Sequence, residues 1–82
     1  MSKKQKLIIK FLNANHAYTW SDLVALLCAL GFEPIEGNGS RVKFDNGNPE
    51  QVINLHKPHP QKEIKVYAIR QVREKLQSYG LI

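Results

Sequence analysis

A chain of 82 residues has room for one hydrophobic core, and it is too short to enclose a deep cavity or a buried cofactor. Its apolar fraction of 43% is ordinary for a globular protein, and no apolar run approaches the roughly 18 residues that a membrane span needs. We therefore expect a soluble protein with no membrane partner and no cofactor. The net charge of +5 favours a polyanion such as nucleic acid, or an acidic protein, as partner.

The excess of positive charge is concentrated in the second half of the chain. Residues 1–39 carry four basic and three acidic side chains, whereas residues 40–82 carry eight and four. Such an excess also improves solubility, so composition alone does not decide between a binding surface and a solvated one.

Two helices are predicted first. Apolar residues recur at helical spacing between lysines over residues 3–13, namely Leu7, Ile8, Phe11 and Leu12. In the second helix, "YTWSDLVALLCALGF", Thr19 is a suitable N-cap and a leucine stripe follows at Leu23, Leu26, Leu27 and Leu30. Gly31 should end this helix, and Phe32 should fold back toward Leu27.

Three short strands are predicted next. Pro34 cannot donate a ladder hydrogen bond, so residues 32–37 should form an edge strand. Apolar and polar residues alternate in "SRVKFDN" at residues 40–46 and in "QVINLH" at residues 51–56. Glycine and asparagine turns at residues 37–39 and 46–48 separate the strands, which predicts an antiparallel meander.

A basic helix is predicted at the end, over residues 65–79, with Gly80 as its stop. Its apolar stripe consists of Val66, Ile69, Val72, Leu76 and Tyr79. Helices before and after the meander can cover one face of the sheet, which predicts an α+β fold of order α-α-β-β-β-α. We expect one domain over residues 1–82.

The uncovered face of the sheet is the candidate binding surface. If Val42, Phe44, Ile53 and Leu55 face the helices, the residues that face solvent together are Arg41, Lys43, Asn54 and His56. Cations bind phosphate, an amide can pair with a base edge or a 2′-hydroxyl, and an imidazole can move a proton. The alternative is that these side chains merely solvate the sheet. No acidic cluster accompanies them, so a two-metal nuclease is not predicted.

The stretch "HKPHP" at residues 56–60 also raises the question of a metal site. The prolines at 58 and 60 exclude a helix that would bring His56 and His59 onto one face, and no cysteine or carboxylate completes a tetrahedral set nearby. No metal is therefore predicted. The prolines should instead stiffen the exit from the third strand and hold Lys57 and His59 at the end of the sheet.

Three other residues have less specific signals. Cys28 is the single cysteine and lies within an apolar helical pattern, so it is interpreted as a small core residue. Trp20 fits core packing. Tyr67 lies off the main stripe of its helix, where it could be a surface packing residue or a stacking platform for a base.

The chain resembles the HicA toxin family in stretches that follow the leucine-rich helix: "GFEPIEGNGSRVKF" at residues 31–44, "LHKPHP" at residues 55–60, and a basic helix that ends in "YGLI" at residues 79–82. The resemblance covers approximately residues 20–82 and implies a small bacterial mRNA interferase with a fold like the double-stranded-RNA-binding domain. It also implies a HicB antitoxin as partner. The core would span residues 19–82, and the helix within residues 1–15 looks like an addition.

This sequence departs from the family pattern at one position. The resemblance implies a catalytic histidine after the Gly39-Ser40 pair, and here that residue is Arg41. A guanidinium stays protonated, so it can bind phosphate but cannot accept a proton from a 2′-hydroxyl. We expect His56 to be the substitute base, with His59 as second choice.

The resulting hypothesis is a HicA-type toxin that binds mRNA and cleaves it without a metal in the cytoplasm. Lys10 interrupts the apolar run near the N-terminus and no small-residue cleavage site follows, so no signal peptide is predicted. The residues expected to bind RNA are Ser40, Arg41, Lys43, Asn54 and Lys57. The alternatives are a non-catalytic RNA-binding module and an antitoxin-binding module.

Overall fold

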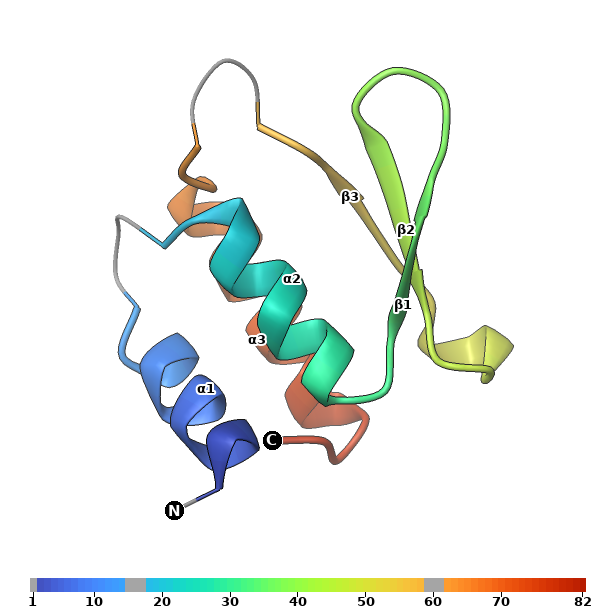
Figure 1. The fold of residues 1–82 in the computed structure, drawn as a ribbon. Helices are drawn as coiled ribbons and strands as arrows, with labels where there is room; N and C mark the ends of the chain where they lie inside the picture. Colours follow the sequence, from blue (N-terminus) through green and yellow to red (C-terminus); the bar gives the residue numbers. More distant parts are fainter. Residues whose placement is uncertain (1, 15–17, 59–61) are drawn as a thin grey trace.

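A computed structural model describes residues 2–14, 18–58 and 62–82. Its elements are α1 (Lys3–Leu12), α2 (Trp20–Ala29), β1 (Glu33–Glu36), β2 (Arg41–Asp45), a 3-10 turn (Pro49–Gln51), β3 (Ile53–His56) and α3 (Val66–Ser78). The helices lie on one side of the three-stranded sheet (Figure 1). The predicted α+β fold and its order are confirmed. None of the described helices is both long and apolar enough to cross a membrane.

The ends of α2 form as their local chemistry predicts. The Thr19 hydroxyl accepts a hydrogen bond of 3.1 Å from the backbone N–H of Asp22, which caps the first turn. At the other end Gly31 has φ of 97°, a conformation that favours glycine. The N–H of Phe32 then donates to the carbonyl of Leu27 at 2.9 Å. These contacts fix where the chain leaves the helix to enter β1.

The sheet is an antiparallel meander of order β1-β2-β3, as predicted. In its register Val42 lies opposite Leu55 and Phe44 lies opposite Ile53, so these apolar side chains share the face that the helices cover. Pro34 lies in the edge strand β1, where its missing N–H leaves no gap in the ladder.

The third strand is shorter than predicted. Gln51, expected to begin it, lies instead in the 3-10 turn, Val52 follows that turn, and the strand starts at Ile53. Pro49 occupies the start of the turn, and the Asn48 side chain accepts a hydrogen bond of 3.0 Å from the N–H of Glu50. This local capping competes successfully with strand pairing at that point.

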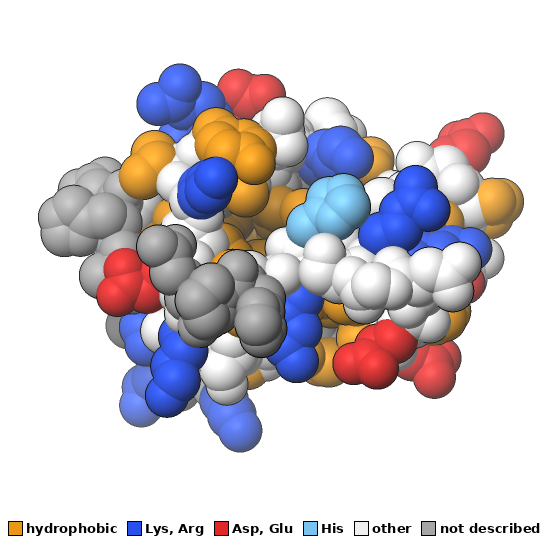
Figure 2. All heavy atoms as spheres, turned by 90° about the horizontal axis from the view of Figure 1, so that it is seen from above, with side chains coloured by type: hydrophobic (Ala, Val, Ile, Leu, Met, Phe, Trp, Pro, Cys, Tyr) orange, Lys and Arg blue, Asp and Glu red, His pale blue; other side chains and the backbone are white. Residues whose placement is uncertain are grey.

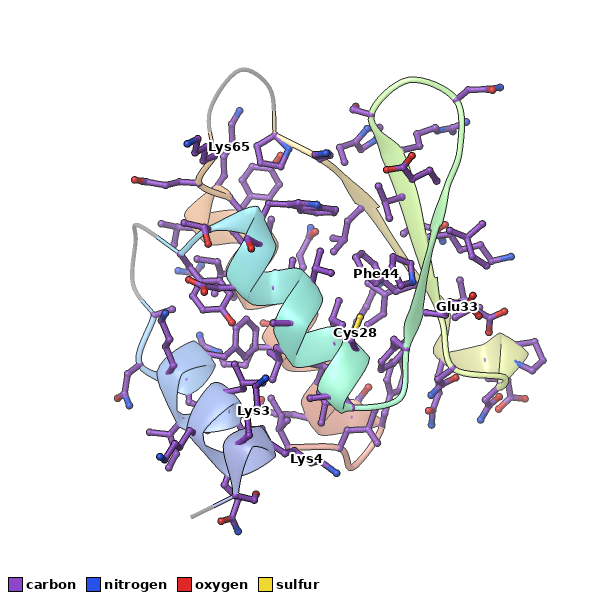
Figure 3. All side chains as sticks on the ribbon, in the orientation of Figure 1. Lys3, Lys4, Cys28, Glu33, Phe44 and Lys65 are labelled. Carbon is purple, nitrogen blue, oxygen red and sulfur yellow. The ribbon has the colours of Figure 1, made fainter. Side chains whose placement is uncertain are left out.

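The core lies between the sheet and the helices. Phe44 is fully buried, points from the sheet toward the helices, and packs on Trp20 with ring centroids 5.7 Å apart, whereas Glu33 points away (Figure 3). Tyr18 is also buried, and its hydroxyl donates to the carbonyl of Asp22 at 3.3 Å. Burial, with a smaller contribution from the Asp22 charge, raises the pKa of Tyr18 to about 12.

Helix α1 contributes to this same core. Phe11 is fully buried and packs against Tyr18 with ring centroids 5.4 Å apart. An ion pair of 3.2 Å between Lys10 and Asp22 joins α1 to α2 at the surface. The aromatic contact should matter more, because exposed ion pairs contribute little to stability.

Some predicted core positions are wrong. Cys28 is exposed rather than buried, because it lies about 100° around α2 from Leu27, outside the sector that faces the core. Leu12 and Val66 are 40% and 46% exposed. They are the last residue of α1 and the first residue of α3, where a helix stripe extends beyond the elements that cover it.

We expect Phe11→Ala to lower the free energy of unfolding by about 3–5 kcal/mol, because the substitution removes a buried aromatic ring from the centre of the core. The control is Ile9→Ala in the same helix, where the side chain is 43% exposed and the change should be about 0.5 kcal/mol. Urea unfolding followed by circular dichroism measures both. Equal effects of the two substitutions would contradict a role for α1 in the core.

Candidate nucleic-acid interface

The open face of the sheet carries the polar residues that the alternation predicts. Arg41 lies directly opposite His56 in the β2–β3 ladder, and Lys43 lies opposite Asn54. All four side chains are exposed. Because residues directly opposite each other project to the same side with Cβ atoms about 5 Å apart, the four form one continuous surface. The prediction that they face solvent together is confirmed, and their roles in binding or catalysis stay predictions.

These side chains line a shallow hollow of about 410 Å³ that also includes the turn between β1 and β2. We call it the cationic hollow, and its lining is Ile35, Glu36, Gly37, Asn38, Arg41, Val42, Lys43, Asn54, Leu55 and His56. In a space-filling view a histidine side chain lies at the surface beside basic side chains (Figure 2). An extended phosphate backbone can reach such an open site without entering the protein.

Two of the three carboxylates in the strands lie at the far end of the sheet from Arg41, whereas the third, Glu36 of β1, lines the cationic hollow. Arg41 begins β2 and Asp45 ends it, with Glu33 of β1 as the Cα partner of Asp45. Within residues 2–14, 18–58 and 62–82 the ion pair found joins Lys10 to Asp22 on the helical side. No described carboxylate therefore lies within ion-pair distance of Arg41 or Lys43. Both side chains can attract an anion.

Ser40 holds the imidazole of His56. Its hydroxyl oxygen lies 3.3 Å from Nδ1, and the backbone N–H of Lys57 donates to the Ser40 carbonyl at 2.7 Å. Gly39 has φ of 64°, which lets the turn bring Ser40 to the end of β3. The contact at Nδ1 orients the ring and leaves Nε2 available to a ligand. Sequence analysis selected Ser40 as an RNA ligand and missed its contact with the histidine.

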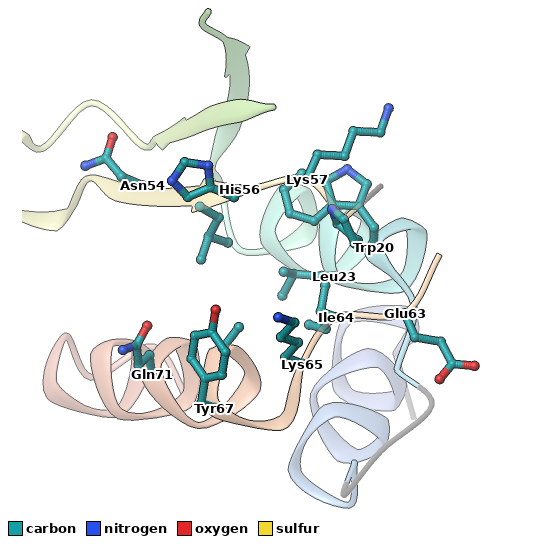
Figure 4. Close-up of a pocket in the computed structure, with 13 residues that line it drawn as sticks. Trp20, Leu23, Asn54, His56, Lys57, Glu63, Ile64, Lys65, Tyr67 and Gln71 are labelled. Carbon is teal, nitrogen blue, oxygen red and sulfur yellow. The ribbon is translucent and has the colours of Figure 1, made fainter. Parts of the chain in front are cut away.

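A second hollow, of about 310 Å³, lies on the other side of His56, between β3 and the first turns of α3. We call it the aromatic cleft, and the lining residues on which the argument depends are Trp20, Asn54, His56, Lys65, Tyr67 and Gln71 (Figure 4). Two backbone hydrogen bonds of 2.9 Å position its end: Trp20 N–H donates to the Lys62 carbonyl, and Ile64 N–H donates to the Tyr18 carbonyl. Sequence analysis singled out Tyr67 but did not predict the cleft.

The remaining predicted site residues are placed less centrally. Lys57 follows β3 and lines the aromatic cleft rather than the cationic hollow. His59 lies outside the described residues. In the part of the chain that the structure describes, no three or more His, Cys, Asp or Glu side chains gather closely enough to hold a metal ion.

The sequence matches a known protein family over most of its length. A family described as "HicA toxin of bacterial toxin-antitoxin" matches residues 20–78. The chain belongs to the HicA toxin family. Its match runs from the start of α2 to the end of α3 and so contains every described residue of both hollows, whereas α1 lies outside it. Comparisons with curated proteins and with solved structures gave no match.

Membership of this family makes the chain the toxin of a toxin–antitoxin pair. Helix α1 lies before the matched residues, but its Phe11 is buried in the core. The core of this HicA-family chain therefore includes a helix that the family match does not.

We expect Arg41→Glu to elute from immobilised heparin at a clearly lower salt concentration than the unchanged protein, because the substitution reverses a charge within the cationic hollow. Lys3→Glu is the matched control: it changes the net charge equally at an exposed position of α1 (Figure 3). An equal loss of retention in both variants would mean that only the total charge matters.

Proposed function

We propose that this member of the HicA family is an mRNA interferase that binds RNA at the cationic hollow and cleaves it without a metal in the cytoplasm. The observation that supports this most strongly is the pairing of Arg41 with His56 across the β2–β3 ladder, with the Ser40 hydroxyl 3.3 Å from the imidazole. A guanidinium, which can bind phosphate, and an imidazole, which can accept a proton, thereby lie side by side on an open surface.

The proposed reaction is internal transesterification of the RNA backbone. In the tautomer in which Nδ1–H of His56 donates to the Ser40 hydroxyl oxygen, Nε2 is unprotonated and takes the proton from a 2′-hydroxyl, whose oxygen then forms a bond to the neighbouring phosphorus. The bond from phosphorus to the 5′-oxygen breaks, and that oxygen leaves with a proton from solvent or from His59. Arg41 and Lys43 stabilise the extra negative charge on the phosphorane. The products are a 2′,3′-cyclic phosphate and a 5′-hydroxyl.

The position of Arg41 gives this mechanism its particular form. The family pattern places a histidine directly after the Gly39-Ser40 pair, and here a guanidinium occupies that position. His56 is the direct cross-strand partner of that same position, so the Cβ atoms of the two residues lie about 5 Å apart on adjacent strands. In this proposal the proton acceptor is His56 on β3, and Arg41, at the β2 position of the family's histidine, binds phosphate.

We expect His56→Ala to reduce the rate of RNA cleavage by about 10²- to 10⁴-fold, the usual contribution of a general base. Cleavage is measured with purified protein, a labelled RNA and a chelator. His59→Ala is the comparison, because it removes the second candidate imidazole and should have the smaller effect. If His59→Ala abolished cleavage while His56→Ala retained it, the assigned base would be wrong.

A second candidate function is RNA binding without cleavage, and the presence of Arg41 in place of the family's histidine favours it. In that case the unchanged protein would bind RNA with a strong salt dependence but leave it uncut. The RNA would also stay intact with either histidine variant. The same experiment therefore separates the two functions.

We propose that the antitoxin is of the HicB type and that an acidic surface on it covers the cationic hollow. The cluster of Arg41 and Lys43 without a described carboxylate in contact supports this partner chemistry. Co-purification of the neighbouring reading frame's product with the chain, weakened by Arg41→Glu and not by Lys3→Glu, tests it. If both variants recovered the same amount of the partner protein, the antitoxin would not bind at the cationic hollow.

A further inference from the structure

The aromatic cleft contains an aromatic ring that the core does not use. Tyr67 lies in the first turn of α3 and is 61% exposed, the most exposed of the large hydrophobic side chains described. Its ring rises from α3 into the space below β3 (Figure 4). The aromatic pairs found among the described residues are Phe11 with Tyr18 and Trp20 with Phe44. Tyr67 belongs to neither pair. An exposed ring in this position offers a face to a planar ligand.

The polar groups around Tyr67 suit a nucleotide. Gln71 is one helical turn further along α3, on the same side as Tyr67, and both line the cleft together with Asn54 of β3. Amide side chains both donate and accept hydrogen bonds, as the edges of bases require. Lys57 and Lys65 also line the cleft and can bind a phosphate, and they outnumber Glu63, the one carboxylate in the described lining.

The cleft and the cationic hollow share a wall. Asn54 and His56 line both cavities, so the imidazole stands between the cations of the sheet and the ring of Tyr67. A nucleotide whose phosphate contacts Arg41 and whose ribose lies over His56 would direct its base toward the cleft. The volume of about 310 Å³ is at the low end of small-molecule sites, which is enough for one nucleotide but not for a segment of duplex.

We propose that the aromatic cleft binds one unstacked base of the RNA, with Tyr67 as the stacking platform and Gln71 as a contact to the base edge. This inference rests on the proposed RNA-binding function and adds a base subsite to it. A base within a duplex is paired and stacked and cannot enter the space between β3 and α3. The nucleotide beside the cleaved bond must therefore be single-stranded, unlike the duplex that a double-stranded-RNA-binding domain recognises by shape.

The test uses a single-stranded 2′-O-methyl RNA, which has no free 2′-hydroxyl and so reports binding independently of cleavage. We expect Tyr67→Ala to weaken its binding roughly 5- to 150-fold, the effect of losing one base–aromatic stack, whereas Tyr67→Phe retains most of the affinity. Val66→Ala is the control, because Val66 is an exposed neighbour that does not line the cleft. Circular dichroism establishes that each variant is folded.

An abasic nucleotide moved along the same oligonucleotide identifies the base. At one position in the RNA, the abasic nucleotide should weaken binding to the unchanged protein as much as the Tyr67→Ala substitution weakens binding of the intact RNA. The same abasic RNA should bind the Tyr67→Ala variant no more weakly than the intact RNA does. Trp20 is the single tryptophan of the chain and lines the cleft, so nucleoside 3′-monophosphates should change its fluorescence.

The outcomes separate this inference from the proposed function. If the RNA binds the Tyr67→Ala variant as tightly as the unchanged protein and no abasic position matters, the base pocket is wrong while RNA binding stands. If the unchanged protein binds no RNA and its tryptophan fluorescence does not respond, both proposals are wrong. Equal affinity for the same sequence in a duplex would also overturn the pocket.

Discussion

The register between β2 and β3 is the constraint on which the candidate site depends. Side chains alternate strictly along a strand, so a slip of one residue would turn Arg41 toward the helices and Val42 toward solvent. Burial of Val42, Phe44 and Ile53 makes that slip costly, because each would lose its apolar contacts. The hydrophobic face of the sheet thereby fixes the polar face, and the pairing of Arg41 with His56 follows from packing on the opposite side.

The helices define the rest of the site. Trp20 packs on Phe44, and its backbone N–H donates to the carbonyl of Lys62, just before α3. These contacts hold the N-terminal ends of α2 and α3 together next to β3. This arrangement makes His56 the shared wall of an open cationic hollow and a narrower aromatic cleft. In the proposed function, phosphate lies on one side of the imidazole and a base on the other. Phe11 of α1 supports the same core from outside the family match.

The sequence predicted the features that depend on local chemistry. The Thr19 cap, the stop at Gly31 and the shared face of Arg41 and His56 all follow from short-range rules, and the structure agrees with them. Cys28 was misplaced because apolar residues surround α2 almost completely, so their periodicity does not identify the covered side. The aromatic cleft could not be predicted, because it depends on how α3 packs beside β3. The contact between Ser40 and His56 likewise depends on the conformation of a turn.

The central claim is that Arg41 and His56 act on the same phosphate across two strands. Titration of the isotope-labelled protein with 2′-O-methyl RNA, followed by NMR of side-chain signals, tests it most directly. The account predicts that the Arg41 guanidinium and the His56 imidazole signals shift together with one affinity, while signals of Lys3 on α1 stay unchanged. Perturbation confined to the helical side, or of only one of the two residues, would contradict it.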